Sequence, residues 1–160
     1  MARSMPEAPK TWILTGWPEN FDTTRGHGFR LIGMLRKERR RNQALEMEPG
    51  DRIVFYLTRL APFAGSVRIA GELFEDRVRV WRGKPGKPDP YPWRFPTAPE
   101  VVLDEADWVA AEELKDELEH ARKWPSEHWR LAFQGQLRTV SHADAALLLD
   151  RLRAAAGAPA

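Results

Sequence analysis

The amino-acid sequence predicts an α+β domain whose sheet is small and strongly bent or barrel-like. Short apolar segments bounded by glycine or proline recur along the chain, and such segments are typical of buried strands. Segments with helical spacing of apolar residues lie before, beside and after them. Half a dozen short strands flanked by helices are the pattern of an α+β domain.

Length and composition narrow the class of protein further. A chain of 160 residues is one domain by the usual length prior, and we expect a tail over 1–10, a single domain over 11–153 and a second tail over 154–160. The sequence has no cysteine, which excludes disulfides and thiolate ligands and suits a cytoplasmic location. It also has no apolar run of membrane-spanning length, so we expect no membrane partner.

The central strand is expected within Met47–Thr58. Pro49–Asp51 has the residue types of a tight turn, and Ile53–Tyr56 follows as an unbroken run of residues that favour strands. A short apolar run of this kind is typical of a strand buried on both faces. Tyr56 and Thr58 lie on the same face, where they would line a pocket or belong to the core.

Trp17 is expected at the end of the first strand. Thr11–Thr15 has the composition of a short buried strand, and Gly16–Asn20 interrupts it with a glycine and a proline. Loops at strand ends commonly bind ligands, which makes Trp17 a candidate binding residue.

The most basic segment is Phe29–Leu45. Its apolar residues Leu31, Met34 and Leu35 have helical spacing, which predicts a helix there. Net charge is only +2, so a basic surface requires clustering. Such a run is either a solvated helix face or a contact for phosphates, which the arginine fork binds well. The clustered cations are Arg36, Lys37, Arg39, Arg40 and Arg41.

The second half of the chain is expected to complete the sheet. Six prolines within Arg82–Pro99 exclude a helix there and predict an exposed flap in its first half. Asp104–Lys123 is expected to be partly helical, and Ser141 is expected to cap a closing helix that packs on the sheet. Further strands are expected over Ser66–Phe74, around Val78–Trp81, over Tyr91–Leu103 as an edge strand, and over Gln136–Val140.

The sequence offers no pattern that indicates catalysis. The four histidines, His27, His120, His128 and His142, lack metal-ligand spacing. Gly83–Pro88 lacks the phosphate-loop pattern, and its prolines remove amide donors. We therefore expect no catalytic residue, metal or cofactor.

Several segments together resemble the EVE-domain family. That family belongs to the PUA-like superfamily and is related to the YTH readers of methylated adenine. The resemblance covers roughly residues 11–152 and is strongest in the sequences PGDRIVFY, YPWRF and WPSEHW. The segments that carry it are Thr11–Asn20, Arg25–Arg41, Met47–Thr58 with Phe63, Tyr91–Phe95 and Lys123–Phe133.

The resemblance implies a PUA-like bent β-sheet pseudo-barrel with flanking helices and a pocket that holds a flipped, modified base of DNA or RNA. It implies a non-catalytic protein. We expect a monomer, and a stand-alone domain of this size must pass its signal to an effector protein that the sequence does not identify. The pocket residues that it implies are Trp17, Asn20, Phe29, Tyr56, Thr58 and Phe63. Trp81 and Trp93 flank the flap, and either could close the pocket. The cations above would contact the nucleic-acid backbone. The other tryptophans, Trp12, Trp108, Trp124 and Trp129, are expected in the core.

An alternative comes from the related ASCH branch, which includes ribonucleases that would use the same basic cleft. The ASCH pattern of spaced glycine, lysine, glutamate and arginine is not reproduced around Gly33–Arg39, where the charges are nearly contiguous. This difference favours a non-catalytic reader of a modified base over a ribonuclease.

Overall fold

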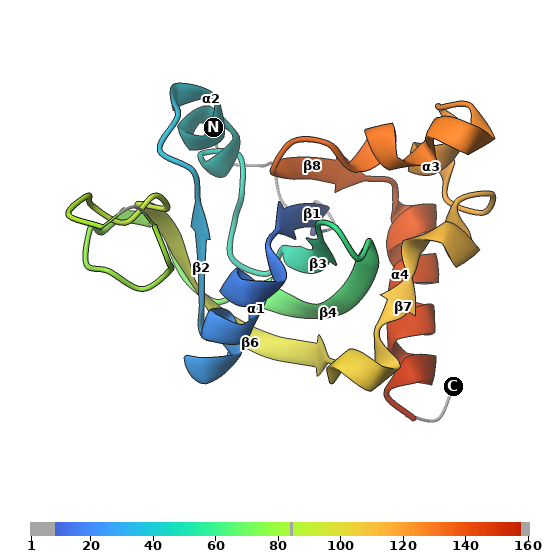
Figure 1. Cartoon of the computed structure of the whole chain (residues 1–160), viewed down its shortest axis with the longest axis horizontal. Coiled ribbons are helices and arrows are strands. Elements are labelled where there is room, and N and C mark those ends of the chain that lie inside the picture. Colours follow the sequence, from blue (N-terminus) through green and yellow to red (C-terminus); the bar gives the residue numbers. More distant parts are fainter. Residues whose placement is uncertain (1–8, 84, 158–160) are drawn as a thin grey trace.

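The computed structural model describes residues 9–83 and 85–157, and within them the chain forms one curled sheet with helices at its ends (Figure 1). The main strand order is β2-β6-β4-β3-β1-β8, with β5 paired to β6 and β7 paired to β4. The strands are β1 Thr11–Gly16, β2 Leu31–Met34, β3 Arg52–Leu57, β4 Pro62–Ile69, β5 Phe74–Glu75, β6 Trp93–Val102, β7 Val109–Ala110 and β8 Leu137–Val140.

The α-helices flank this sheet. They are α1 Pro18–Gly26, α2 Glu38–Ala44, α3 Glu119–Arg122 and α4 His142–Ala155, and short 3₁₀ turns cover Glu105–Asp107, Ala111–Leu114 and Ser126–Phe133. The α+β class and the bent sheet predicted from the sequence are confirmed. None of the helices in the described part of the chain is long and apolar enough to span a membrane.

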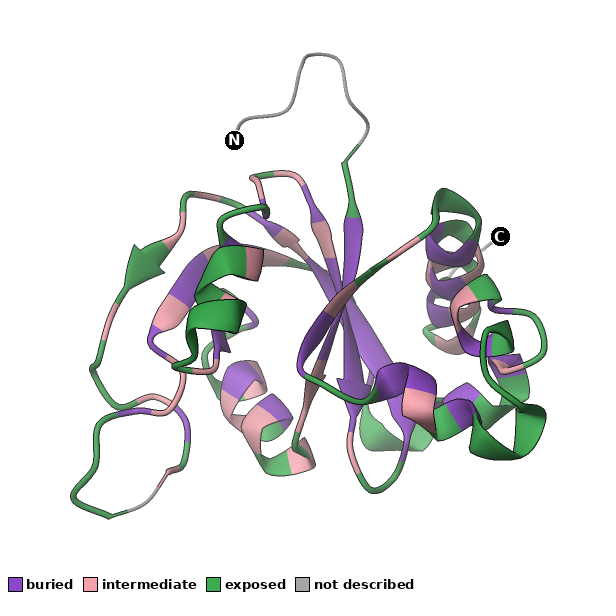
Figure 2. Ribbon diagram, turned by 90° about the horizontal axis from the view of Figure 1, so that it is seen from above, coloured by how far each residue is buried: buried purple, intermediate pink, exposed green. Residues whose placement is uncertain are grey.

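Strand β3 is central and buried on both faces, as its apolar run predicts (Figure 2). It pairs in parallel with β1 and antiparallel with β4. Val54 and Tyr56 point into a core that includes α4, whereas Ile53 and Phe55 point into a second core that includes α1. The alternation of side chains along one strand thus divides the interior into two halves.

The predicted helix over Leu31, Met34 and Leu35 is wrong, because the segment Leu31–Met34 forms strand β2 instead. Gly33 lies at its centre, and a Cβ there would lie 2.6 Å from the ring of Trp81. Close packing against that ring and a ladder with β6 therefore outweigh the helical spacing. The helix begins only at Glu38, as α2.

Strand β6 is an interior strand and not the predicted edge. Its first half pairs with β2 and β5, and its second half pairs with β4. Pro99 is tolerated because the ladder with β4 shifts register between Ser66 and Val67, opposite that proline. The edges of the main path are β2 and β8.

The sheet curls until its two edges approach each other, but they are not joined by a ladder in the described strands. Side chains join them instead. Leu35, just after β2, donates its backbone N–H to Oε1 of Gln136, just before β8, at 2.7 Å. Gln43 of α2 donates to the carbonyl of Leu137 at 3.1 Å. We call this junction between β2 and β8 the seam.

Several smaller boundaries also differ from the sequence prediction. Residues 78–81 do not form the predicted strand, and residues 85–88 of the loop that follows them are exposed, before the buried residue Asp89. Helix α1 was not predicted; Pro18 stands at its first turn, where a missing N–H costs nothing. Helix α4 ends at Ala155, two residues beyond the expected domain boundary, and the expected tail residues 1–8 and 158–160 lie outside the described chain.

The cap of α4 is confirmed, because the N–H of Asp144 donates to Oγ of Ser141 at 3.2 Å. The carboxylate of Asp144 turns to a different helix. It accepts the backbone N–H groups of Glu119 and His120 at 2.8 and 2.9 Å and so satisfies the start of α3.

A candidate ligand pocket and a basic groove

A pocket opens between α1, the ends of β1 and β3, and strand β2. It lies at the end of the curled sheet and takes residues from both sides of the seam. Its lining residues are Leu14, Thr15, Gly16, Trp17, Asn20, Phe21, Thr24, Ile32, Gly33, Phe55, Leu57, Trp81, Tyr91 and Gln136.

Trp17 forms the exposed wall of this pocket. It precedes Pro18 in extended conformation, and its carbonyl accepts the N–H groups of Asn20 and Phe21 in the first turn of α1. The side chain is 48% exposed, and the guanidinium of Arg59 lies 4.9 Å from its ring centroid. Arg59 is itself held by Glu19 at 2.7 Å. The indole is therefore positioned at the mouth without being part of the core.

Trp81 forms a wall that is fixed by its surroundings. It is 4% exposed, and its indole N–H donates to Oγ1 of Thr24 at 3.0 Å. The ring of Tyr91 meets it edge-on at 5.7 Å. The glycine at position 33 allows this close approach, because any Cβ there would overlap the indole.

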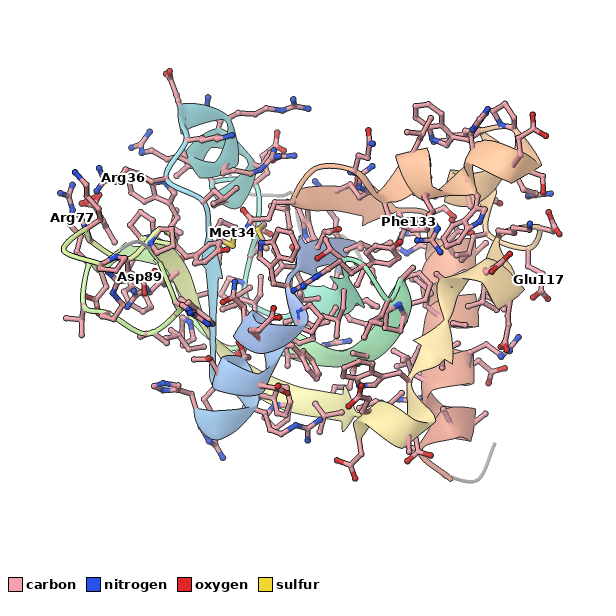
Figure 3. All side chains as sticks on the ribbon, in the orientation of Figure 1. Met34, Arg36, Arg77, Asp89, Glu117 and Phe133 are labelled. Atoms are coloured by element: carbon pink, nitrogen blue, oxygen red, sulfur yellow. The ribbon has the colours of Figure 1, made fainter. Side chains whose placement is uncertain are left out.

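The loop that carries Trp81 is held by a buried carboxylate. Asp89 accepts the backbone N–H groups of Val80, Trp81 and Tyr91 at 2.7–2.8 Å and lies 3.3 Å from the guanidinium of Arg94. Figure 3 shows Asp89 on the side of the sheet where this loop emerges. The middle of the predicted flap, residues 85–88, is exposed as expected. Its two ends are fixed, because Trp81 and Asp89 are buried.

Three polar side chains face the pocket with defined partners. Asn20 donates an amide N–H to the hydroxyl of Tyr91 at 3.0 Å, and burial raises the pKa of Tyr91 above its ordinary value. Gln136 is 8% exposed, and its backbone carbonyl accepts the N–H of Thr15 at 2.7 Å. Its Oε1 accepts the N–H of Leu35, and its Nε2 donates to no acceptor among the described residues.

Gln136 is a pocket residue that the sequence did not indicate. A glutamine between a glycine and a strand carries no motif, and its contact with Leu35 spans 101 residues of chain. Because the group of Leu35 that faces Gln136 is a backbone N–H donor, the carboxamide oxygen of Gln136 must point to it. The carboxamide therefore presents a donor, and not an acceptor, on its free side.

The prediction that Tyr56 and Trp17 form two walls of one pocket is wrong. Phe55 and Leu57 face the pocket, so the alternation along β3 places Tyr56 on the opposite face. There Tyr56 stacks on Phe133 at 4.7 Å, and Phe63 packs edge-on against it at 5.7 Å. Phe133 lies on the side of α3 and α4, away from Asp89 and its loop (Figure 3).

Three further predicted pocket residues also lie outside the lining. Phe29 is buried behind the pocket, 5.3 Å from Phe21, in a left-handed backbone conformation with φ of 56°. Thr58 follows β3, and its hydroxyl has no partner among the described residues. Trp93 lies on β6, with the guanidinium of Arg41 5.6 Å from its ring. The structure thus brings together Trp17, Asn20 and Trp81 from the predicted set.

A broad, open groove runs between α2 and β8 and is rich in cations. Arg39 and Arg40 line it from the predicted basic run, whereas Arg36, Lys37 and Arg41 do not. Its other basic or aromatic residues are Lys10, Trp12, His120, Lys123, Trp124, Arg138 and His142. We call this surface the basic groove.

The remaining tryptophans divide between core and surface. Trp12 and Trp129 are buried, as expected, and Trp108 is half-buried. Trp124 is 41% exposed in the basic groove, so its predicted core position is wrong. The proline that follows it ends the local helix and leaves the indole at the surface.

His120 lines the basic groove, and burial lowers its pKa below the usual value, which keeps its ring neutral at neutral pH. The described residues hold no group of three or more histidine, aspartate or glutamate side chains that could bind a metal.

Comparisons with known proteins show the fold. Neither a protein-family model nor a curated protein matches the chain. The YTH domain of Pho92, solved with m6A, has a TM-score of 0.65 at 11% identity, over 95% of this chain and 88% of that chain. The YTH domain of Zygosaccharomyces rouxii MRB1, solved with N6-methyladenosine RNA, has a TM-score of 0.64 at 15% identity, over 94% of this chain and 91% of that chain.

Human THYN1, solved with DNA containing 5-methylcytosine, has a TM-score of 0.61 at 15% identity, over 90% of this chain and 98% of that chain. These identities establish the architecture alone. The chain has the PUA-like fold that YTH domains and THYN1 share, and these structural neighbours were solved with modified nucleobases.

Proposed function

We propose that this chain is a non-catalytic reader of one modified nucleobase in DNA or RNA, and that it is an EVE-type member of the PUA-like fold. The observation that carries the proposal is the pocket at the end of the curled sheet, with aromatic walls from Trp17 and Trp81. Apolar and aromatic walls with a few polar groups are the combination typical of small-ligand sites. The bases held by the structural neighbours add support.

The physical requirements of base reading match the pocket. A base that leaves its stack loses a few kcal/mol, and an aromatic platform returns about 1–3 kcal/mol per base. A buried methyl group adds roughly 0.8 kcal/mol, which is about fourfold in affinity. Stronger selection requires hydrogen bonds to the base edge, for which Asn20, Tyr91 and Gln136 are available.

A binding screen of short oligonucleotides, each carrying a single modified base, tests the proposal. We expect at least one modification to bind at least about fourfold more tightly than its unmodified counterpart, with the labelled strand recovered intact. Equal affinity for every modified and unmodified strand, in DNA and in RNA, would overturn the reader. Cleavage of the strand that is lost on changing Lys37 and Arg39 would favour the ribonuclease alternative.

The free donor of Gln136 leads to a prediction about base identity. Gln136→Glu keeps an acceptor for the N–H of Leu35 but replaces the donor at Nε2 by an acceptor. We expect the substitution to weaken binding of the preferred oligonucleotide by roughly 10-fold to 100-fold, because an acceptor on the base would then face a carboxylate. The measurement is affinity at pH 8, where the carboxyl is ionised.

A matched control separates this effect from added negative charge. Gln134→Glu adds the same charge two residues away, in the basic groove and outside the pocket lining. It should weaken the preferred strand and the same strand with an abasic site by equal factors. Gln136→Glu should weaken mainly the strand that carries the base, and equal weakening of both strands would contradict a reading role.

A further inference from the structure

Two arginines from distant parts of the sequence meet beside Gly135 at the seam. Arg40 comes from α2 and Arg138 from β8. A Cβ built on Gly135 would lie 3.2 Å from Nη2 of Arg138 and 3.5 Å from Nη2 of Arg40. Both guanidinium groups therefore converge on one point in the basic groove.

The charges of this pair are not balanced by the protein. Neither arginine forms an ion pair with a carboxylate in the described part of the chain. Arg40 donates to the side-chain oxygen of Gln43 at 2.8 Å, and Arg138 donates to the carbonyls of Ala132 and Gly135. The Nε atoms of both arginines are buried without a hydrogen-bond partner.

Burial and repulsion by neighbouring arginines both act against the two charges. Burial lowers the pKa of Arg138, and the charges of Arg40 and Arg39 lower it further. Burial also lowers the pKa of Arg40, with a smaller contribution from Arg39. Two like charges with reduced hydration are costly unless an anion accepts their free N–H groups.

We propose that Arg40 and Arg138 form a clamp for one phosphate group of the nucleic-acid strand whose base enters the pocket. The clamp rests on the proposed function for the source of its phosphate. Gly135 lines the basic groove and the next residue, Gln136, lines the pocket, so the two sites are joined by one peptide bond. Two planar forks that converge on one point suit a tetrahedral oxyanion.

The clamp replaces the contiguous basic run as the point of backbone contact. Arg41 is adjacent to Arg40 in sequence, yet it lies over the ring of Trp93 and outside the groove lining. If the basic run were only a solvated helix face, Arg40 and Arg41 would contribute equally to the attraction of a nucleic acid. Only Arg40 lines the groove. Arg41→Gln removes the same charge from outside the groove and is therefore the matched control for Arg40→Gln.

The first arm of the test measures oligonucleotide affinity against salt concentration. Arg40→Gln and Arg138→Gln should each reduce the slope of log affinity on log salt by about 0.7–0.9, the value for one phosphate. The double variant should reduce it little further, because both residues hold the same phosphate. Arg41→Gln should leave the slope unchanged, and equal slopes for all three single variants would overturn the clamp.

The second arm uses inorganic phosphate and does not depend on the proposed function. Phosphate should raise the melting temperature of the wild type and of Arg41→Gln above that in chloride of equal ionic strength. The rise should disappear in Arg40→Gln and Arg138→Gln. A rise that is the same in all four proteins, or absent from all, would overturn the clamp even where oligonucleotides bind.

Other outcomes separate the clamp from the reader. A clamp that behaves as expected in a protein without preference for any modified base would overturn the proposed function and leave the phosphate site. If no oligonucleotide binds, the phosphate arm alone decides the clamp. Competition by poly-glutamate as effective as that by phosphate would overturn the assignment to phosphate and indicate an acidic protein partner.

Discussion

Trp17→Ala is expected to abolish the preference for the modified base while leaving the melting temperature unchanged. The indole supplies the exposed wall of the pocket, and a stacking platform contributes about 1–3 kcal/mol per base, or roughly fivefold to more than a hundredfold in affinity. Its 48% exposure means that its removal leaves no cavity in the core. Competition between modified and unmodified oligonucleotides measures the preference.

Trp129→Ala is the matched control, because it removes the same side chain from the core. Trp129 is buried and packs against Phe133 at 6.2 Å, so its loss should lower the free energy of unfolding by about 3–5 kcal/mol. Chemical denaturation of both variants compares them directly. Were Trp17→Ala to destabilise the protein as much as Trp129→Ala does, Trp17 would be a core residue and the pocket assignment would fail.

Asp89→Ala is expected to lower the free energy of unfolding by about 3–5 kcal/mol. The substitution removes the acceptor of three backbone N–H groups and leaves the guanidinium of Arg94, which is 1% exposed, without its buried partner. Breaking a buried ion pair from one side carries a cost of this size. Urea denaturation measures it.

Asp76→Ala tests whether burial is the cause. Asp76 is the second carboxylate near Arg94, at 3.5 Å, but its side chain is 38% exposed. Exposed ion pairs contribute about 0–1 kcal/mol, so this change should have a small effect. Asp89→Asn, which retains one acceptor oxygen, should fall between the two. Equal effects of Asp89→Ala and Asp76→Ala would contradict the role of Asp89 as the buried support of Trp81.

Local sequence patterns predicted the elements whose stability is local. The turn at Pro49–Asp51, the doubly buried strand that follows it and the Ser141 cap of the last helix are all present. Trp17 was placed at a strand end from the glycine and proline around it, and it lines the pocket there. In each case the residues that determine the conformation are neighbours in sequence.

The features that the sequence did not reveal depend on long-range contacts. The period of β3 placed Tyr56 and Thr58 on one face, but the choice between the two faces depends on which core α1 and α4 cover. The spacing of Leu31 and Met34 suits a helix, but the segment is a strand because Trp81, about fifty residues further along the chain, packs on Gly33. The meeting of Arg40 with Arg138 likewise depends on how far the sheet curls.

The open seam between β2 and β8 has a consequence for the mechanics of ligand exchange. The pocket takes Ile32 and Gly33 from one edge and Gln136 from the other, so a bound ligand bridges two edges that backbone hydrogen bonds do not join in the described strands. By mass action, a ligand at 100 times its dissociation constant would stabilise the folded protein by about 2.7 kcal/mol. A ligand that contacts both edges would therefore add to the two side-chain hydrogen bonds that hold the seam, between Leu35 and Gln136 and between Gln43 and Leu137.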